Sequence, residues 1–126
     1  MPSSIKEQIA AANQSVPKIS ADEARRLIRE EDALLVDVRD APELSASGKL
    51  ADATNVSRGM LEFRADSAMP YHDPEFRPDR PIILYCASGG RSALSGKALQ
   101  DLGYSEVYNL GAFKDATEAG FPTVPA

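Results

Sequence analysis

The stretch PIILYCASGGRSA, residues 81–93, joins a short apolar run to the only cysteine of the chain and then to a run of small residues. The run PIILY, residues 81–85, has the length and composition of a buried strand. Residues 92–102 carry apolar side chains at helical spacing, and Gly103 follows where a helix commonly ends. The stretch therefore predicts a strand, a tight loop and a helix, which together form one unit of an α/β fold.

The same alternation of strands and helices runs along the rest of the chain. Ser20 and Glu23 have the spacing of a capping box at the start of a helix. Residues 65–80, rich in Pro and Asp, are expected to form a long loop. An α/β fold is predicted, with a mostly parallel sheet flanked by helices on both faces. The expected strands lie near 33–38, 53–56 and 107–110, and the expected helices cover 20–29, 59–64 and the residues after 111.

The length of 126 residues suits one ordinary domain. We expect residues 17–126 to form this domain. Residues 1–16 are expected to be an N-terminal extension, in which Ile5 and Ile9 share one side of a short helix.

Composition narrows the classes of function. The chain has 14 Lys and Arg against 19 Asp and Glu, a net charge of -5, which argues against nucleic-acid binding. No apolar run is long enough for a membrane span or a secretory signal, so we expect a cytoplasmic protein that binds no membrane. With one Cys and one His, neither an internal disulfide nor a cluster of zinc ligands is expected, and we expect no metal or cofactor.

The loop after the strand is the candidate active site. Gly89 and Gly90 allow the chain to curl with its N–H groups inward, while Ala87 and Ser88 leave the concavity open. Converging amides at a helix N-terminus favour an anion, so the pKa of Cys86 should be depressed and its thiolate available as a nucleophile. A lone cysteine after an apolar strand is more commonly a buried small hydrophobe. The combination of strand, cysteine, small residues and helix start favours the reactive interpretation.

Four segments together resemble the rhodanese family of sulfurtransferases. The loop Cys86-Ala87-Ser88-Gly89-Gly90-Arg91-Ser92 is similar to the active-site loop of that family, and the likeness extends over about residues 17–120. Its other segments are Val36-Asp37-Val38-Arg39, Asn55-Val56-Ser57-Arg58-Gly59 and Tyr108-Asn109-Leu110-Gly111-Ala112-Phe113.

The resemblance implies a persulfide mechanism. Cys86 would be the nucleophile and sulfur carrier, taking sulfane sulfur from thiosulfate or a related donor and passing it to cyanide or a thiol. Arg91 would contact the sulfonate end of the donor. The backbone amides of the loop would stabilise the thiolate and the persulfide, and they belong to Ala87, Ser88, Gly89, Gly90, Arg91 and Ser92.

The resemblance also suggests supporting residues and shows two departures. Asp37 would orient the loop or Arg91, while Arg39 and Arg58 are weaker candidates that could equally form structural ion pairs. Residues 48–53 (GKLADA) replace the Gly-His-Ile-Pro-Gly-Ala of many members, which affects the packing of this turn more than the chemistry. Ala116 stands where the last helix commonly has Trp, which predicts a thinner local core or a partly open edge.

Three other functions are compatible with the sequence. The domain could be a non-enzymatic partner-binding module, or a persulfide carrier that hands sulfur to an acceptor protein. A cysteine phosphatase also places small residues and Arg after its cysteine, but with a longer spacing than the four residues between Cys86 and Arg91.

Overall fold

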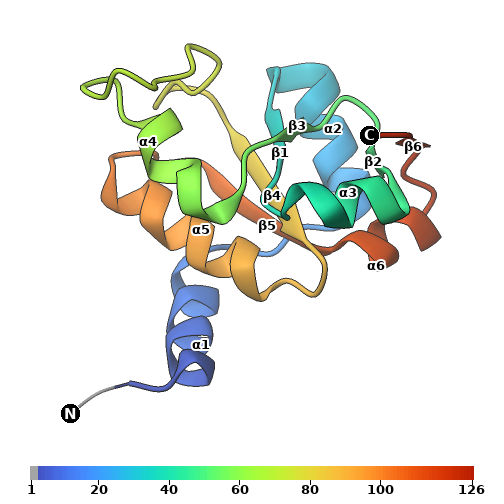
Figure 1. Cartoon of the computed structure of the whole chain (residues 1–126), viewed down its shortest axis with the longest axis horizontal. Coiled ribbons are helices and arrows are strands. Elements are labelled where there is room, and N and C mark those ends of the chain that lie inside the picture. The colour runs from blue at the N-terminus through green and yellow to red at the C-terminus, as the bar shows by residue number, and fades with distance from the viewer. Residues whose placement is uncertain (1–2) are drawn as a thin grey trace.

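A four-stranded parallel sheet forms the centre of the protein (Figure 1). The computed structural model describes residues 3–126. Each neighbouring pair in the sheet is parallel, which confirms the predicted sheet. The strand order is β3-β1-β4-β5. The strands are β1 (Leu34–Asp37), β3 (Thr54–Asn55), β4 (Ile82–Cys86) and β5 (Val107–Ala112).

Helices precede, connect and follow these strands, and a small second sheet lies near the C-terminus. The helices are α1 (Ile5–Ser15), α2 (Ala21–Glu31), α3 (Ala41–Ser47), α4 (Leu61–Ala65), α5 (Gly90–Asp101) and α6 (Phe113–Glu118), with a 3-10 turn η1 (Arg58–Met60) before α4. Strand β2 (Lys49–Leu50) pairs antiparallel with β6 (Thr123–Val124). Within residues 3–126, no helix has the length and hydropathy to cross a membrane.

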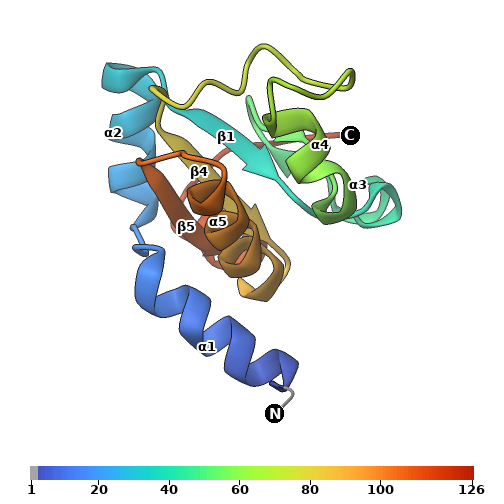
Figure 2. The ribbon, with the colours of Figure 1, turned by 90° about the vertical axis from the view of Figure 1, so that its left-hand side faces the viewer.

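The alternation of side chains along the strands divides the core into two halves. Val36 of β1 packs with Leu99 of α5 in one half, and Leu35 packs with Leu27 of α2 in the other. Helices α4 and α5 cover the first face and α2 covers the second (Figure 2). Helix α6 also packs on the second face, so helices lie on both faces as predicted. Ala116 of α6 is buried in the second half.

The capping box expected at the start of α2 forms only in part. Ser20 caps the helix, and its Oγ accepts a hydrogen bond from the amide of Glu23 at 3.1 Å. The Glu23 carboxylate instead binds Arg26 one turn later, so only the serine half of the expected capping box forms.

Helix α1 packs along α5. A Cβ on Gly96 would lie 2.8 Å from Cγ1 of Val16, and one on Gly90 would lie 3.1 Å from Cδ1 of Ile9. Two glycines of α5 therefore allow the close approach of α1. The second contact brings α1 to the first residue of α5, directly beside the loop that follows Cys86.

An irregularity between β4 and β5 sets which residues face the candidate site. Leu84 pairs with Asn109, but the next pair is Tyr85 with Gly111, so β5 has one extra residue there. This is the geometry of a β-bulge, which commonly lies next to functional loops. As a result Ala112 lies opposite Cys86, and Asn109 lies two pairs further back along the strands.

Candidate active site

Cys86 is the last residue of β4 and lies at the carboxyl edge of the parallel sheet. Ligands of open α/β sheets bind at this edge. Gly89 adopts a φ of +98°, a left-handed conformation that glycine accepts without strain, and α5 begins at the next residue. The loop therefore turns sharply and directs the start of α5 at the sulfur of Cys86, which is fully buried.

The loop donates hydrogen bonds to the thiol. The amide of Gly89 lies 3.0 Å from Sγ of Cys86, and Oγ of Ser92 lies 3.4 Å from it. Burial raises the pKa of Cys86, but the opposing hydrogen bonds outweigh it and leave the pKa below its ordinary value. These bonds come from the Ser92 hydroxyl and from the amides of Ser92, Gly89 and Ser88. The arrangement can hold a thiolate.

Behind the loop, Asn109 completes a buried polar network. Oγ of Ser92 donates to Oδ1 of Asn109 at 2.7 Å, and Nδ2 of Asn109 donates to the carbonyl of Gly89 at 3.3 Å. Ser92 is fully buried and Asn109 is 2% exposed. The sequence analysis did not select Asn109 as a site residue. Its signal in the sequence was a polar amide in a predicted strand, at a position where the alternation of side chains points into the core.

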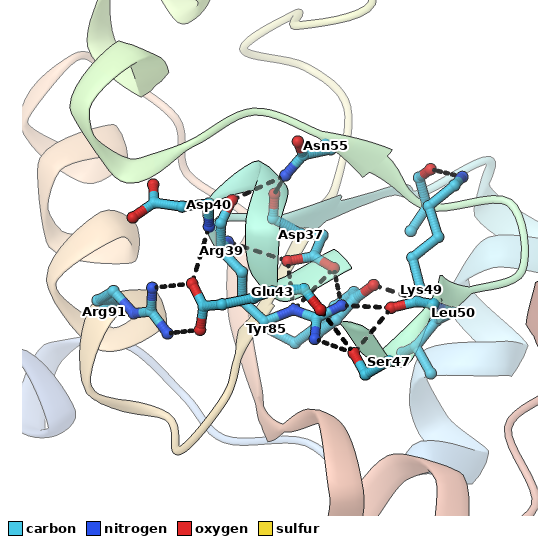
Figure 3. A network of polar contacts seen from close by, with 12 residues as sticks. Asp37, Arg39, Asp40, Glu43, Ser47, Lys49, Leu50, Asn55, Tyr85 and Arg91 are labelled. Atoms are coloured by element: carbon cyan, nitrogen blue, oxygen red, sulfur yellow. Dashed lines mark hydrogen bonds and ion pairs between the residues drawn. The ribbon is translucent and has the colours of Figure 1, made fainter. Parts of the chain in front are cut away.

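Arg91 does not extend freely into the loop's concavity. Its guanidinium binds the carboxylate of Glu43 in α3 through two parallel bonds, Nη1 to Oε2 at 2.7 Å and Nη2 to Oε1 at 2.8 Å (Figure 3). The bonds from Arg91 and from the amide of Asp40 lower the pKa of Glu43 from 4.5 to about 2. The sequence analysis missed Glu43. Its signal was the Asp40-x-x-Glu43 spacing, which does form a capping box on α3.

The three supporting candidates form ion pairs of their own. Asp37 and Arg39 are both buried and bind each other in two-point fashion, with Nη2 to Oδ2 at 2.7 Å (Figure 3). Arg39 also donates to the carbonyl of Gly48, and its guanidinium lies 4.3 Å from the centre of the Phe113 ring. The hydrogen bonds of the Asp37 carboxylate thus go to Arg39, and not to the loop or to Arg91. Arg58 pairs with Glu62 at 2.6 Å on the surface.

A cavity of about 300 Å³ lies beside the loop. Ser88, Gly89 and Gly90 line one side of it, and Asn13 of α1 and Lys18 line another. In the described part of the chain, no three His, Cys, Asp or Glu side chains gather as metal ligands. The reactive group at the site is the thiol of Cys86, to which the amide of Gly89 donates a hydrogen bond.

Comparison with known proteins adds a family to this geometry. The model of the Rhodanese-like domain family matches residues 20–118. A sulfurtransferase from Allochromatium vinosum is 34% identical over 87 residues, which are 69% of this chain and 73% of that protein. Both matches agree with the resemblance found in the sequence.

Two solved structures share the fold at higher coverage. A protein of unknown function from Rhodopseudomonas palustris, described as a possible tyrosine phosphatase, is 35% identical with a TM-score of 0.86, and 98% of this chain and 99% of that one are covered. The polysulfide-sulfur transferase homodimer of Wolinella succinogenes is 32% identical with a TM-score of 0.75, covering 94% and 85%.

Proposed function

Because the chain belongs to the family of Rhodanese-like domains, we propose that it transfers sulfane sulfur from thiosulfate or a related donor, through a persulfide on Cys86. The observation that carries the proposal is the sulfur of Cys86 beneath the Gly89 amide, with hydrogen bonds that lower its pKa despite burial. Relatives named sulfurtransferases support transfer of sulfur as the reaction class. The sulfur donor and the persulfide on Cys86 are the parts of this reaction that we propose.

The first half-reaction needs only the thiolate and the donor. Sγ of Cys86 attacks the outer sulfur of thiosulfate and forms a new S–S bond. The S–S bond of the donor breaks, and its electron pair leaves with sulfite. Negative charge moves from Sγ to the terminal sulfur of the persulfide, so charge and atoms balance without an added oxidant or reductant. The amides of the loop, which favour a thiolate, favour this terminal anion by the same attraction.

Arg91 is proposed to bind the sulfonate of the donor while it stays attached to Glu43. A guanidinium has five N–H groups, and the pair with Glu43 uses two of them. The hydrogen bonds to Glu43 are the main cause that raises the pKa of Arg91, and the charge of Cys86 adds to it, which supports a guanidinium close enough to act on an anion at the sulfur. Glu43 would then act as the residue that positions Arg91.

The second half-reaction is proposed to use an external acceptor. Cys86 is the only cysteine, so no second thiol in this chain can attack the persulfide. Cyanide in an assay, or a small thiol or an acceptor protein in the cell, would remove the sulfur and restore the thiolate. Two half-reactions on one sulfur predict ping-pong kinetics.

We also propose a cytoplasmic location, and a domain of residues 17–126 with residues 1–16 as an extension.

Intact-protein mass spectrometry tests the proposal. After treatment with thiosulfate and removal of excess donor, the mass should rise by one sulfur, return on addition of cyanide, and stay unchanged in Cys86→Ser. If thiosulfate and polysulfide both leave the wild-type mass unchanged, the sulfurtransferase proposal fails. Hydrolysis of p-nitrophenyl phosphate by the same preparation, lost in Cys86→Ser, would then favour a phosphatase. Its absence would favour a partner-binding module.

A further inference from the structure

The hydroxyl of Ser92 has one proton and three neighbours that can accept it. Oδ1 of Asn109 lies at 2.7 Å, the carbonyl of Gly89 at 3.1 Å and Sγ of Cys86 at 3.4 Å. A hydroxyl donates one hydrogen bond at a time. Whichever acceptor takes the proton deprives the other two, and the shortest distance assigns it to Asn109.

The orientation of the Asn109 amide is fixed by its second contact. Nδ2 lies 3.3 Å from the carbonyl of Gly89. Rotating the amide by half a turn would bring its oxygen against that carbonyl oxygen, two acceptors facing each other. Asn109 is also held from its backbone, because its amide donates to the carbonyl of Pro17 and its carbonyl accepts from Ile19. Oδ1 is therefore a permanent acceptor facing Ser92.

We infer that Asn109 is a positioning residue that competes with Cys86 for the proton of Ser92. While Cys86 is a neutral thiol, its S–H can donate to Oγ of Ser92, and Ser92 donates to Asn109. When Cys86 is a thiolate, Ser92 either turns to Sγ and leaves a buried amide oxygen without a donor, or stays with Asn109 and leaves Sγ with its amide bonds alone. Both options cost free energy. Asn109 thus opposes the thiolate that the loop amides favour.

This competition suits a cysteine whose Sγ acts as the nucleophile in the first half-reaction and as the leaving group in the second. Here the inference rests on the proposed function. When the persulfide forms, negative charge leaves Sγ for the terminal sulfur, and the Ser92 proton returns to Asn109 with no acceptor left unpaired. A thiolate that is stabilised less is also a better nucleophile, because nucleophilicity of thiolates falls as their pKa falls. Asn109 would therefore keep Cys86 reactive and favour the loaded state.

Other charged groups near the loop do not make this contact. Arg91 acts on Cys86 through space and is held by Glu43. Asp37 at the end of β1 and Arg39, two residues later, neutralise each other, and Lys18 and Asp115 line the cavity beside Gly89. Substitution of Asn109 changes none of these charges. It also removes the bond from Nδ2 to the carbonyl of Gly89, and the double variant with Ser92→Ala separates that loss from the competition for Ser92.

The test measures iodoacetamide alkylation of Cys86 against pH, which requires no sulfurtransferase activity. In Asn109→Val, which removes the acceptor and suits a strand, the midpoint should fall by about one pH unit, since Ser92 becomes free to donate to the thiolate. In Ser92→Ala the midpoint should rise. In the double variant it should equal that of Ser92→Ala, because Asn109 acts only through Ser92. Asn13→Ala, beside the same cavity, should leave the midpoint unchanged.

Two outcomes overturn the inference. The first is a midpoint in Asn109→Val that stays equal to the wild type or rises. The second is a fall that persists in the double variant, because Asn109 would then act without Ser92. If Asn109→Val does not fold by circular dichroism, Asn109→Ala serves in its place with the same expected directions. The thiosulfate mass shift is measured separately, so failure of the proposed function and failure of this inference are distinguishable.

Discussion

The guanidinium of Arg91 and the carboxylate of Glu43 face each other in a two-point ion pair that joins residues 48 positions apart. Arg91 lies in the first turn of α5, directly after the loop, and Glu43 lies in α3. The pair therefore connects the start of α5 to the element that follows β1 (Figure 3). Because each side chain is about one-third exposed, at 35%, solvent and salt weaken the pair.

The stability contributed by Glu43 should depend on pH. Its pKa in the folded protein, about 2, lies below the ordinary value of 4.5, so its contribution is fully present above pH 4.5 and is lost as the pH falls towards 2. The free energy of unfolding should thus exceed that of Glu43→Gln by a constant amount above about pH 5, and the difference should shrink between pH 4.5 and 2. Urea unfolding at several pH values measures it. A difference that is independent of pH would contradict the ion pair.

Replacement of Arg91 should weaken use of the donor. Loss of a charge-assisted contact to the sulfonate costs on the order of 1.5–3 kcal/mol, or roughly a 10- to 150-fold fall in kcat/KM for thiosulfate in Arg91→Ala. Arg91→Lys should fall between, because lysine keeps the charge but not the two-point geometry. Glu43→Gln serves as the control for loss of the ion pair alone. Steady-state kinetics equal to wild type in Arg91→Ala would place Arg91 outside the donor site.

Gly89 should matter to the thiol beyond its backbone conformation. Gly89 and Gly103 both have a positive φ, +98° and +101°, so Ala costs about 1 kcal/mol or more at each position. Of these two glycines, only Gly89 donates its amide to Sγ. We expect both variants to lose stability in urea, but only Gly89→Ala to raise the alkylation midpoint of Cys86. An equal midpoint in the two variants would show that the Gly89 amide does not stabilise the thiolate.

The buried pair of Asp37 and Arg39 should be a stability element. Asp37→Ala leaves the Arg39 charge buried without its partner, which typically costs about 3–5 kcal/mol. Arg58→Ala is the matched control, since it breaks the half-exposed pair with Glu62 and should cost no more than about 1 kcal/mol. Urea unfolding of the two variants compares them directly. A loss in Asp37→Ala as small as that in Arg58→Ala would show that the buried pair is dispensable.

The fold could be predicted where its signals are local. Strand β4, the loop and α5 follow one another directly in the sequence, and they lie as expected. The differences are that β4 includes Cys86 and that α5 begins at Gly90. The second sheet was not predicted, because Lys49–Leu50 and Thr123–Val124 are two-residue strands that pair with each other across a long stretch of sequence. Helix α3 was not predicted either, although Asp40 and Glu43 form a capping box there.

The candidate site shows the same limit. Cys86 and its loop could be selected from neighbouring residues, whereas their partners come from far away in the sequence. Glu43 and Asn109 reach Arg91 and Ser92 only because the order of parallel strands brings α3 and β5 beside β4. Asp37 pairs in register with Tyr85, next to Cys86, but its carboxylate binds Arg39 two residues away, so this local pair takes both side chains.

The complete burial of Cys86 has a kinetic consequence. A sulfur with no exposed surface cannot be reached from solution, so the loop after Cys86 must open before any reaction at Sγ. The observed rate of modification should therefore rise with reagent concentration at first and then level off, when every opening of the loop leads to capture. The plateau equals the opening rate of the loop and is the same for reagents of different reactivity. The rate at which Cys86 is modified at high reagent concentration would therefore report how often the loop opens.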